Sequence, residues 1–257
     1  MPIRPTDNPE ILNMRGLNLF HYSYSNCSMR IRLFLDEKGI PWNDHFIDLR
    51  AQKNLTEEYF AIHPQGLVPA LVDDGVIVYE SADILEYLEE KFPEPSFTPD
   101  TAEGRAELDK MLEFTRSGHF PVIKTWAYGR NNKPTKTPES MHKLEVLQKD
   151  NKWIVDFHKE TMAEGGIAEE KILAAEKILK GMFADLDDRL SRHEWILGDQ
   201  MTLADIAWIP QYALFQRNNF PFEPYRHWID YVARWQKRPA YVSAIGNHMP
   251  GSMELPY

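Results

Sequence analysis

The pattern of hydrophobic and polar positions divides the chain into two parts of different character. In the first part, short apolar runs alternate with amphipathic segments of helical period, and turn residues separate them. These signals predict strands over residues 17–22, 42–49, 67–72 and 76–79, and helices over residues 28–39, 56–60 and 81–92. The predicted order is βαβα, then a hairpin, then a last helix.

The predicted hairpin has both a strong signal and a conflict. Asp74-Gly75 between two strand-like runs is typical of a tight hairpin turn. Pro69 lies inside the first of these runs, where a proline removes a ladder donor and disfavours a strand. A cis peptide bond before Pro69 at an exposed sheet position would reconcile the two signals. A βαβ half and a ββα half that meet in one sheet make the thioredoxin-like plan, an α/β fold.

The second part contains few strand signals. Prolines at positions 93, 95 and 99 interrupt regular structure, and beyond them helical patterns cover residues 102–117, 143–162, 167–190, 202–216 and 225–237. We therefore predict an all-helical bundle here. The chain divides into an N-terminal extension (1–16), a thioredoxin-like domain (17–93), a linker (94–101), an all-α domain (102–245) and a tail (246–257).

Composition narrows the class of protein. The 257 residues are 43% hydrophobic and 26% charged, which is typical of a soluble globular protein. A net charge of −10 argues against nucleic acid as a partner, because phosphate binding needs a basic face. No run approaches the roughly 20 apolar residues of a membrane span, and the polar first residues lack the apolar core of a secretory signal. With a single cysteine, these features predict a cytoplasmic protein that does not insert in a membrane.

The strongest candidate for chemistry is the junction between the first strand and the first helix. The free N–H groups and partial positive charge of a helix N-terminus stabilise an anion such as a thiolate. A hydrogen bond from the Ser25 hydroxyl to that sulfur would lower its pKa further. Two alternatives stay open: Ser25 does no more than cap the helix, and Cys27 is either a reactive nucleophile or an inert packing residue.

The junction also carries a family resemblance. The run SNCSMRIR at residues 25–32, followed by EKG at 37–39, resembles the N-terminal signature of zeta-like glutathione transferases and glutathione-dependent tetrachlorohydroquinone dehalogenases. The resemblance implies that glutathione is the cosubstrate, with its thiolate beside Ser25 and its contacts extending to Asn26. It also implies that Cys27 is the nucleophile that resolves a glutathionyl mixed disulfide.

Two further motifs match the same superfamily. The run HPQGLVPAL at residues 63–71 resembles its Asn-Pro-x-Gly-x-Val-Pro-x-Leu segment, which implies a cis Pro69 and backbone pairing of Val68 with the cysteinyl unit of glutathione. His63 stands where the family usually has Asn, and Leu67 stands where a Lys or Gln often helps to hold glutathione. Residues 80 and 81, Glu-Ser, resemble the pair that binds the γ-glutamyl end of glutathione, with the acid on the ammonium and the serine on the carboxylate.

The helical part carries the resemblance further. The run GDQMTLAD at residues 198–205 resembles the family's capping box and hydrophobic staple, in which Thr202 and Asp205 cap each other's backbone. The segment over residues 133–169 is longer than in most classes and resembles dehalogenase-type and lignin β-etherase-type members. The family also implies a dimer in which the N-terminal domain of one subunit packs on the helical domain of the other.

Other polar and aromatic residues have ordinary interpretations. Arg30 and Arg32 fit solvated charges on the first helix, and we favour this for Arg32. The nine histidines show no metal-binding spacing, so no metal is expected. Most aromatic and Met side chains of the helical domain should form its core, yet some must face the second substrate. The candidates for that role, with the first two preferred, are Trp126, Tyr128, Met111, Phe114, Trp208 and Tyr212.

The sequence therefore predicts a glutathione transferase that activates the thiol for attack on a hydrophobic, aromatic electrophile. Conjugation, aryl-ether cleavage, dehalogenation and isomerisation share this first step, and the long segment at 133–169 favours ether or halide substrates. The alternative is a non-catalytic glutathione-binding, ligand-binding or scaffold protein of the same fold, which His63 and Leu67 support best.

Overall fold

The first part of the chain is built on a five-stranded sheet. The structure is a computed structural model that describes residues 3–131, 136–149 and 151–249. The strand order is β1-β5-β4-β2-β3, and β2 (Leu17–His21) runs parallel to β3 (Asn43–Phe46). β4 (Ala70–Asp73) is antiparallel to both β2 and β5 (Val76–Tyr79). The predicted thioredoxin-like plan is confirmed.

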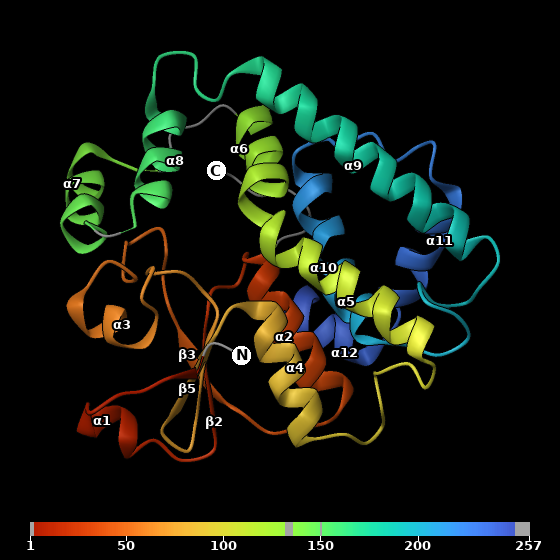
Figure 1. The fold of residues 1–257 in the computed structure, drawn as a ribbon, viewed down its shortest axis with the longest axis horizontal. Coiled ribbons are helices and arrows are strands. Elements are labelled where there is room, and N and C mark those ends of the chain that lie inside the picture. Colours follow the sequence, from red (N-terminus) through yellow and green to blue (C-terminus); the bar gives the residue numbers. More distant parts are fainter. Residues whose placement is uncertain (1–2, 132–135, 150, 250–257) are drawn as a thin grey trace.

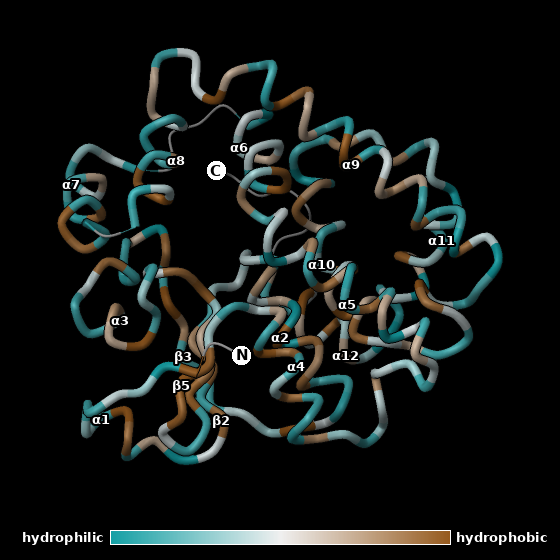
Figure 2. Tube along the Cα trace, viewed as in Figure 1, coloured by the Kyte–Doolittle hydropathy of each residue, from teal (hydrophilic) through white to brown (hydrophobic). Residues whose placement is uncertain are grey.

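Helices cover both faces of this sheet (Figure 1). α2 (Asn26–Glu37) and α4 (Ser81–Lys91) lie on one face, and α3 (Glu57–Ile62) with α1 (Pro9–Leu12) lies on the other. Because side chains alternate along a strand, Leu19 packs into the core under α2 and α4, whereas its neighbour Phe20 packs towards α3. Figure 2 shows hydrophobic residues gathered along these strands.

The sequence pattern gave no signal for two N-terminal elements. β1 (Ile3–Arg4) pairs antiparallel with β5, with Ile3 opposite Val78. α1 begins after its N-cap Asn8, whose side chain accepts a hydrogen bond from Glu10 N, and it buries Ile11. A two-residue strand is too short for alternation to be visible, so the sequence could not reveal it.

The second part is all-helical, as predicted. Its elements are α5 (Ala102–Ser117), the π-helix η1 (His119–Lys124), α6 (Thr125–Asn131), α7 (Pro138–Leu147), α8 (Lys152–Met162), α9 (Glu169–Leu190), α10 (Leu203–Arg217), α11 (Arg226–Trp235), α12 (Pro239–Tyr241) and the π-helix η2 (Val242–Gly246). In the described part of the chain, no helix has both the length and the hydrophobicity to cross a bilayer.

α10 is the central helix of this part and is buried along most of its length. The predicted capping box is present: the Thr202 side chain accepts from the backbone of α10, and the Asp205 carboxylate accepts from Thr202 N at 2.7 Å. Asp205 also accepts from Ile196 N and from the Tyr231 hydroxyl, so one buried carboxylate joins three segments.

One predicted helix was wrong. Residues 143–162 form two helices, α7 and α8, not one. α7 ends at its C-cap Gln148, whose side chain donates to Pro64 O at 3.1 Å and accepts from the Asn151 side chain at 2.8 Å. The polar residues around the break therefore fix α7 and α8 to the loop at Pro64 in the first part, a tertiary contact that helical periodicity does not report.

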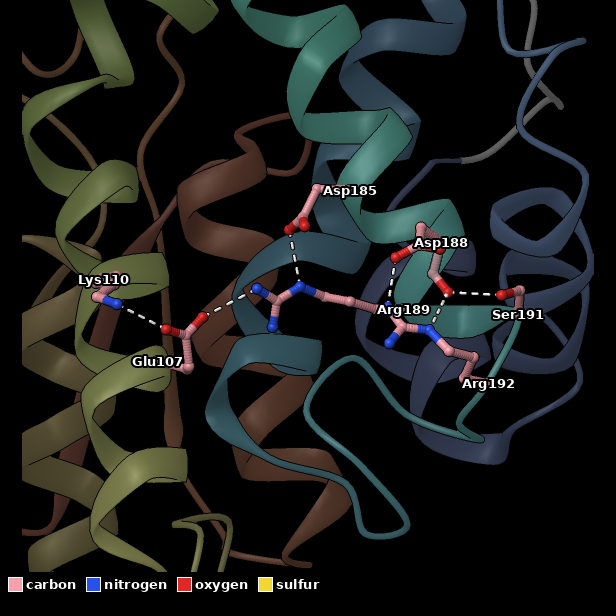
Figure 3. Close-up of polar contacts among 7 residues, drawn as sticks. All are labelled: Glu107, Lys110, Asp185, Asp188, Arg189, Ser191 and Arg192. Carbon is pink, nitrogen blue, oxygen red and sulfur yellow. Dashed lines mark hydrogen bonds and ion pairs between the residues drawn. The ribbon is translucent and has the colours of Figure 1, made fainter.

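Ion pairs join α5 to α9 on the outer side of the helical part (Figure 3). Glu107 on α5 accepts from Lys110 at 2.7 Å and from Arg189 on α9 at 2.9 Å. Arg189 in turn donates to Asp185 at 2.7 Å. These side chains are partly solvated, so each pair contributes little to stability, and their role is to fix the register of two helices.

Candidate functional site at the N-terminus of α2

The start of α2 presents its first N–H groups at the junction of the two parts. β2 ends at His21, and the chain turns back through residues 22–25. Ser25 is the N-cap, and its hydroxyl oxygen accepts from Ser28 N at 3.2 Å. That bond uses a lone pair and leaves the hydroxyl proton free to donate elsewhere. Capping and activation of a sulfur by Ser25 are therefore compatible.

Cys27 is the second residue of α2, within its first turn, and faces the helical part. Its Sγ is 3.4 Å from Nε2 of His119, the first residue of η1. The Arg30 guanidinium lies 3.8 Å from the same sulfur. Burial lowers the pKa of His119 well below its usual value, and the nearby Lys124 and Arg30 lower it further, so the imidazole is neutral. The thiol is partly exposed and has a ring nitrogen and a cation beside it.

Arg30 is fully enclosed and links the two parts, so it is not the solvated charge that the sequence suggested. Its Nε donates to Ala207 O on α10 at 2.9 Å, and its Nη1 donates to the Ser81 hydroxyl at 2.8 Å. Burial lowers the pKa of Arg30, while Cys27 and Glu80 act against this shift. The remaining nitrogen, Nη2, has no hydrogen-bond partner among the described residues.

The favoured interpretation of Arg32 was also wrong. Arg32 is 0% exposed, because its guanidinium reaches Ala244 O in η2 at 2.7 Å and Ser23 O at 3.0 Å. It also lies 3.0 Å from Nδ1 of the buried His21. Burial lowers its pKa to about 9. Charge on an amphipathic helix usually faces water, and only the fold shows that this face of α2 packs against η2.

The loop before β4 lies next to this junction in the sheet. The Val68-Pro69 peptide bond is cis, as expected, and β4 starts directly after it at Ala70. The Tyr59 hydroxyl donates to Leu67 O at 2.6 Å, and this bond fixes the loop to α3. Leu67 and Val68 are partly exposed, and the backbone of Val68 belongs to no ladder of the sheet.

Glu80 has a backbone conformation that non-glycine residues rarely adopt, with φ 68° and ψ 117°. Such a conformation costs about 1–3 kcal/mol and is concentrated at functional sites. Glu80, not Ser81, is the N-cap of α4, and its side chain makes no capping bond. Its carboxyl group is largely enclosed: burial raises its pKa, nearby Asp83 adds to this, and Arg116 and Arg30 oppose it. Ser81 is the first residue of α4 and accepts from Arg30.

Asn26 points away from the thioredoxin-like part. Its amide nitrogen donates to Gln211 Oε1 on α10 at 2.7 Å, and its Oδ1 accepts from Lys124 Nζ on η1 at 3.2 Å. Its side chain is thus committed to the helical part. The backbone N–H groups at the start of α2 are the part of this region that faces the junction.

The six predicted substrate contacts lie in different places. Trp126 and Trp208 are 1% and 0% exposed in the helical core, and Phe114 stacks on Trp208 with ring centroids 5.7 Å apart. Tyr212 packs beside Phe222. The remaining two, Met111 and Tyr128, are placed differently: Met111 lines a cavity between α5 and α9, and Tyr128 lies beside Lys124 near the start of α2.

Three residues of the junction were missed by sequence reasoning: His119, Lys124 and Gln211. Each comes from the helical part and meets α2 only in the fold. A Lys or His without a motif around it carries no local signal. The one hint was the sequence GHFP at residues 118–121, which interrupts a long helical pattern and becomes a π-helix.

The two most evident cavities lie away from this junction. One, of about 520 Å³, lies between the end of α2 and α12, beside Trp42. The other, of about 360 Å³, lies between α5 and α9 and is bordered by Glu107 and Arg189 of Figure 3. Neither is near Ser25 or Cys27. In the described part of the chain, no group of three His, Cys, Asp or Glu side chains is placed to hold a metal ion.

Comparison with known proteins identifies the class. The family model described as "Glutathione S-transferase, N-terminal domain" matches residues 24–91, and the model "Glutathione S-transferase, C-terminal domain" matches residues 161–234. The two matches together cover more than half of the chain, so the chain belongs to the glutathione S-transferase superfamily.

Individual relatives show where in the superfamily it is similar. The chain is 26% identical over 239 residues to glutathione S-transferase Z2 from Arabidopsis thaliana, covering 91% of this chain and 92% of the relative. It is 27% identical to maleylacetoacetate isomerase from Mus musculus, covering 80% and 82%. Among solved structures, β-etherase LigF from Sphingobium sp. strain SYK-6 matches with a TM-score of 0.71 and 23% identity, covering 90% of this chain and 99% of that one.

Proposed function

We propose that this chain binds glutathione across the junction described above and activates its thiol for attack on an electrophile. The observation that carries the proposal is the arrangement around Arg30. This one buried side chain ties Ser81 of α4 to α10 and lies against Cys27 at the start of α2. These contacts support the proposal that the predicted glutathione contacts at the start of α2 and at the start of α4 belong to one site.

The thiol, the cysteinyl backbone and the γ-glutamyl end of glutathione each have a suitable partner in this proposal. The thiolate rests at the free N–H groups of α2 and accepts a hydrogen bond from Ser25, which lowers its pKa. The peptide backbone pairs with Val68, whose N–H and C=O are outside the sheet ladders. The γ-glutamyl ammonium meets the Glu80 carboxylate, and its α-carboxylate meets the N-terminus of α4 at Ser81.

The proposed fall in thiol pKa can be expressed as a free energy. A fall in thiol pKa of two to three units from ~8.5 corresponds to roughly 3 to 4 kcal/mol of preferential thiolate stabilisation. Because the thiolate is the nucleophile, its fraction at neutral pH then rises from a few per cent to most of the bound glutathione. The relatives named as a transferase, an isomerase and a β-etherase support the class of reaction but do not choose among conjugation, isomerisation, ether cleavage and dehalogenation.

Cys27 has a separate proposed role. In a reductive reaction, the Cys27 thiolate would attack the sulfur of a glutathionyl conjugate of the substrate. The disulfide between Cys27 and glutathione forms, the bond from that sulfur to the substrate carbon breaks, and the carbon keeps the electron pair and takes a proton. A second glutathione thiolate would then displace Cys27 and leave as oxidised glutathione; the neutral His119 and the Arg30 cation lie beside Cys27. Its partial exposure fits this role. The alternative is that Cys27 only packs against His119.

The test is turnover of aryl ether and aryl halide panels with glutathione, in wild type and in the separate variants Ser25→Ala and Cys27→Ala. Loss of turnover on all substrates in Ser25→Ala alone supports thiol activation. If Cys27→Ala loses turnover only on halides that undergo reductive dehalogenation, the result supports thiol–disulfide exchange at Cys27. Tight glutathione binding with no turnover on any electrophile would instead support a non-catalytic binding protein.

We also propose a dimer, on the family pattern in which the N-terminal domain of one subunit packs on the helical domain of the other. Sedimentation at micromolar concentration tests it directly: a mass of one 30.0 kDa chain would contradict it.

A further inference from the structure

An aromatic cluster extends from the junction into the helical part. It contains Phe120 and Tyr128, which follow α5, and Trp153 and Phe157 of α8. The Phe120 ring lies 4.8 Å from Trp153 and 5.1 Å from Phe157, and Phe157 lies 5.9 Å from Tyr128. Phe120 also contacts His119, the neighbour of Cys27. Neighbouring rings meet edge to face or tilted, and the four members are partly or well exposed, so they offer an aromatic surface next to the start of α2.

A lysine lies between this aromatic cluster and the start of α2. Lys124 Nζ is 3.2 Å from Asn26 Oδ1 and 5.3 Å from the centre of the Tyr128 ring. An ammonium group carries three donors, and the bond to Asn26 uses one of them. The charge of Lys124 also acts on His119, whose ring nitrogen lies 3.4 Å from the sulfur of Cys27, so Lys124 borders the start of α2.

The two histidines near Lys124, His119 and His158, are neutral because burial lowers both pKa values, so the positive charge of this region comes from Lys124 and Lys136. The charge of Lys124 lowers the pKa of both His119 and His158, and the charge of Lys136 also lowers the pKa of His158. Within the described ranges, seven lysines form ion pairs with acids, and neither Lys124 nor Lys136 is one of the seven. The chain as a whole has a net charge of −10, so a positive region of this kind is local and specific.

We propose that Lys124 binds a carboxylate of the second substrate, so that the natural electrophile is a flat, conjugated anion lying on the aromatic cluster. This inference rests on the proposed transferase function and deepens it, because it names the chemical class of the electrophile. Lys124 supplies a charge-assisted hydrogen bond, and the aromatic rings supply stacking. Lys136 strengthens the positive field and need not touch the substrate.

Lys124 contributes to the choice between an anionic and an uncharged electrophile. An anionic electrophile repels an approaching thiolate, and a cation between the two reduces this repulsion. An uncharged electrophile of the same shape gains nothing from Lys124. The signature is therefore a change in the ratio of catalytic efficiencies for a matched acid and amide, not a general loss of activity.

The test uses 4-chloro-3-nitrobenzoate and 4-chloro-3-nitrobenzamide with glutathione. In both, the thiolate forms a C–S bond at carbon 4, and the C–Cl bond breaks with chloride leaving with the electron pair. Lys124→Gln is expected to lower kcat/KM for the benzoate about tenfold, chiefly through KM, and to change kcat/KM for the benzamide less than about twofold. Lys110→Gln, an exposed lysine on α5 that pairs with Glu107, is the matched control and should change neither.

Each outcome decides the proposal. An equal loss on both electrophiles, or a higher KM for glutathione with an unchanged acid-to-amide ratio, would overturn it and assign Lys124 to glutathione or to the fold. Lys136→Gln serves as a second variant. It should lower the ratio of kcat/KM for the benzoate to kcat/KM for the benzamide by a smaller factor than Lys124→Gln does. If no variant, wild type included, turns over either the benzoate or the benzamide, the transferase function itself fails, and that result is separate from an unchanged ratio.

Discussion

Glu80 illustrates how one side chain can combine strain, burial and charge. Its backbone has a φ of 68°, its carboxyl group is enclosed, and the helix that follows gains no capping bond from it. If position 80 served only the fold, glycine would adopt this positive φ at a lower energetic cost. The strain is explained if the carboxylate must point at a ligand, and the ammonium of glutathione is the partner that we propose.

The raised pKa of Glu80 gives the first prediction. Because burial raises that pKa, the carboxylate becomes protonated at a higher pH than an ordinary glutamate, and it then loses its attraction for an ammonium. As pH falls, glutathione affinity measured by calorimetry should therefore begin to weaken at a higher pH than an ordinary glutamate would give. Glu80→Gln should weaken binding about tenfold at pH 7.5 and should flatten this pH dependence. Glu90→Gln, on the exposed face of α4, is the control; wild-type affinity in Glu80→Gln would contradict the assignment.

Among the helices, α2 shows what periodicity can and cannot predict. The pattern placed this helix correctly and marked Ser25 as its start, because capping and amphipathicity are local properties. It assigned Arg32 to water, because η2, which covers that face of α2, lies more than 200 residues away in the chain. The same reason explains the missing break between α7 and α8 and the missed His119 and Lys124: each depends on a contact between distant segments.

The burial of Arg32 predicts a large effect on stability. Arg32→Leu removes the donors to Ala244 O, Tyr22 O and Ser23 O and leaves these acceptors unpaired in a closed region. Urea denaturation should show a loss of about 3 kcal/mol in the free energy of unfolding. The control is Arg192→Leu, an exposed residue shown in Figure 3, which should change that free energy by less than about 0.5 kcal/mol. Similar losses in the two variants would contradict the account of α2.

For the molecule as a whole, the sequence was sufficient for the fold class because three motifs and a change in period agreed. Their spacing reproduced the thioredoxin-like sheet, the capping box of α10 and the cis Pro69. The second-substrate side was harder to predict, because aromatic residues serve cores and binding sites equally well. Trp126 and Trp208 lie in the core, whereas Phe120 and Phe157, which the sequence did not single out, lie near the junction.

Burial of histidine makes the stability of the whole molecule depend on pH. Burial lowers the pKa of His63 to about 3, below the ~6.5 of an unfolded chain. The folded state thus binds fewer protons, so the contribution of His63 to stability falls as pH drops from about 6.5 towards 3. Between pH 7 and pH 5, His63→Asn should lose about 2 kcal/mol less unfolding free energy than wild type. Asn can still accept the bond that His63 takes from Gln65 N. An identical loss in both proteins would show that His63 is not neutral in the folded state.

The most direct test of the central claim is titration of the thiol of bound glutathione, followed by the ultraviolet absorbance of the thiolate. In wild type, the pKa of that thiol should lie at least about two units below the pKa of free glutathione. Ser25→Gly removes the hydroxyl at little cost in capping, because glycine is also accepted at an N-cap, and it should raise the pKa of the bound thiol by about one unit or more, whereas Ser25→Thr should retain most of the wild-type shift. An unshifted thiol in wild type, or the same shift in Ser25→Gly, would contradict the account.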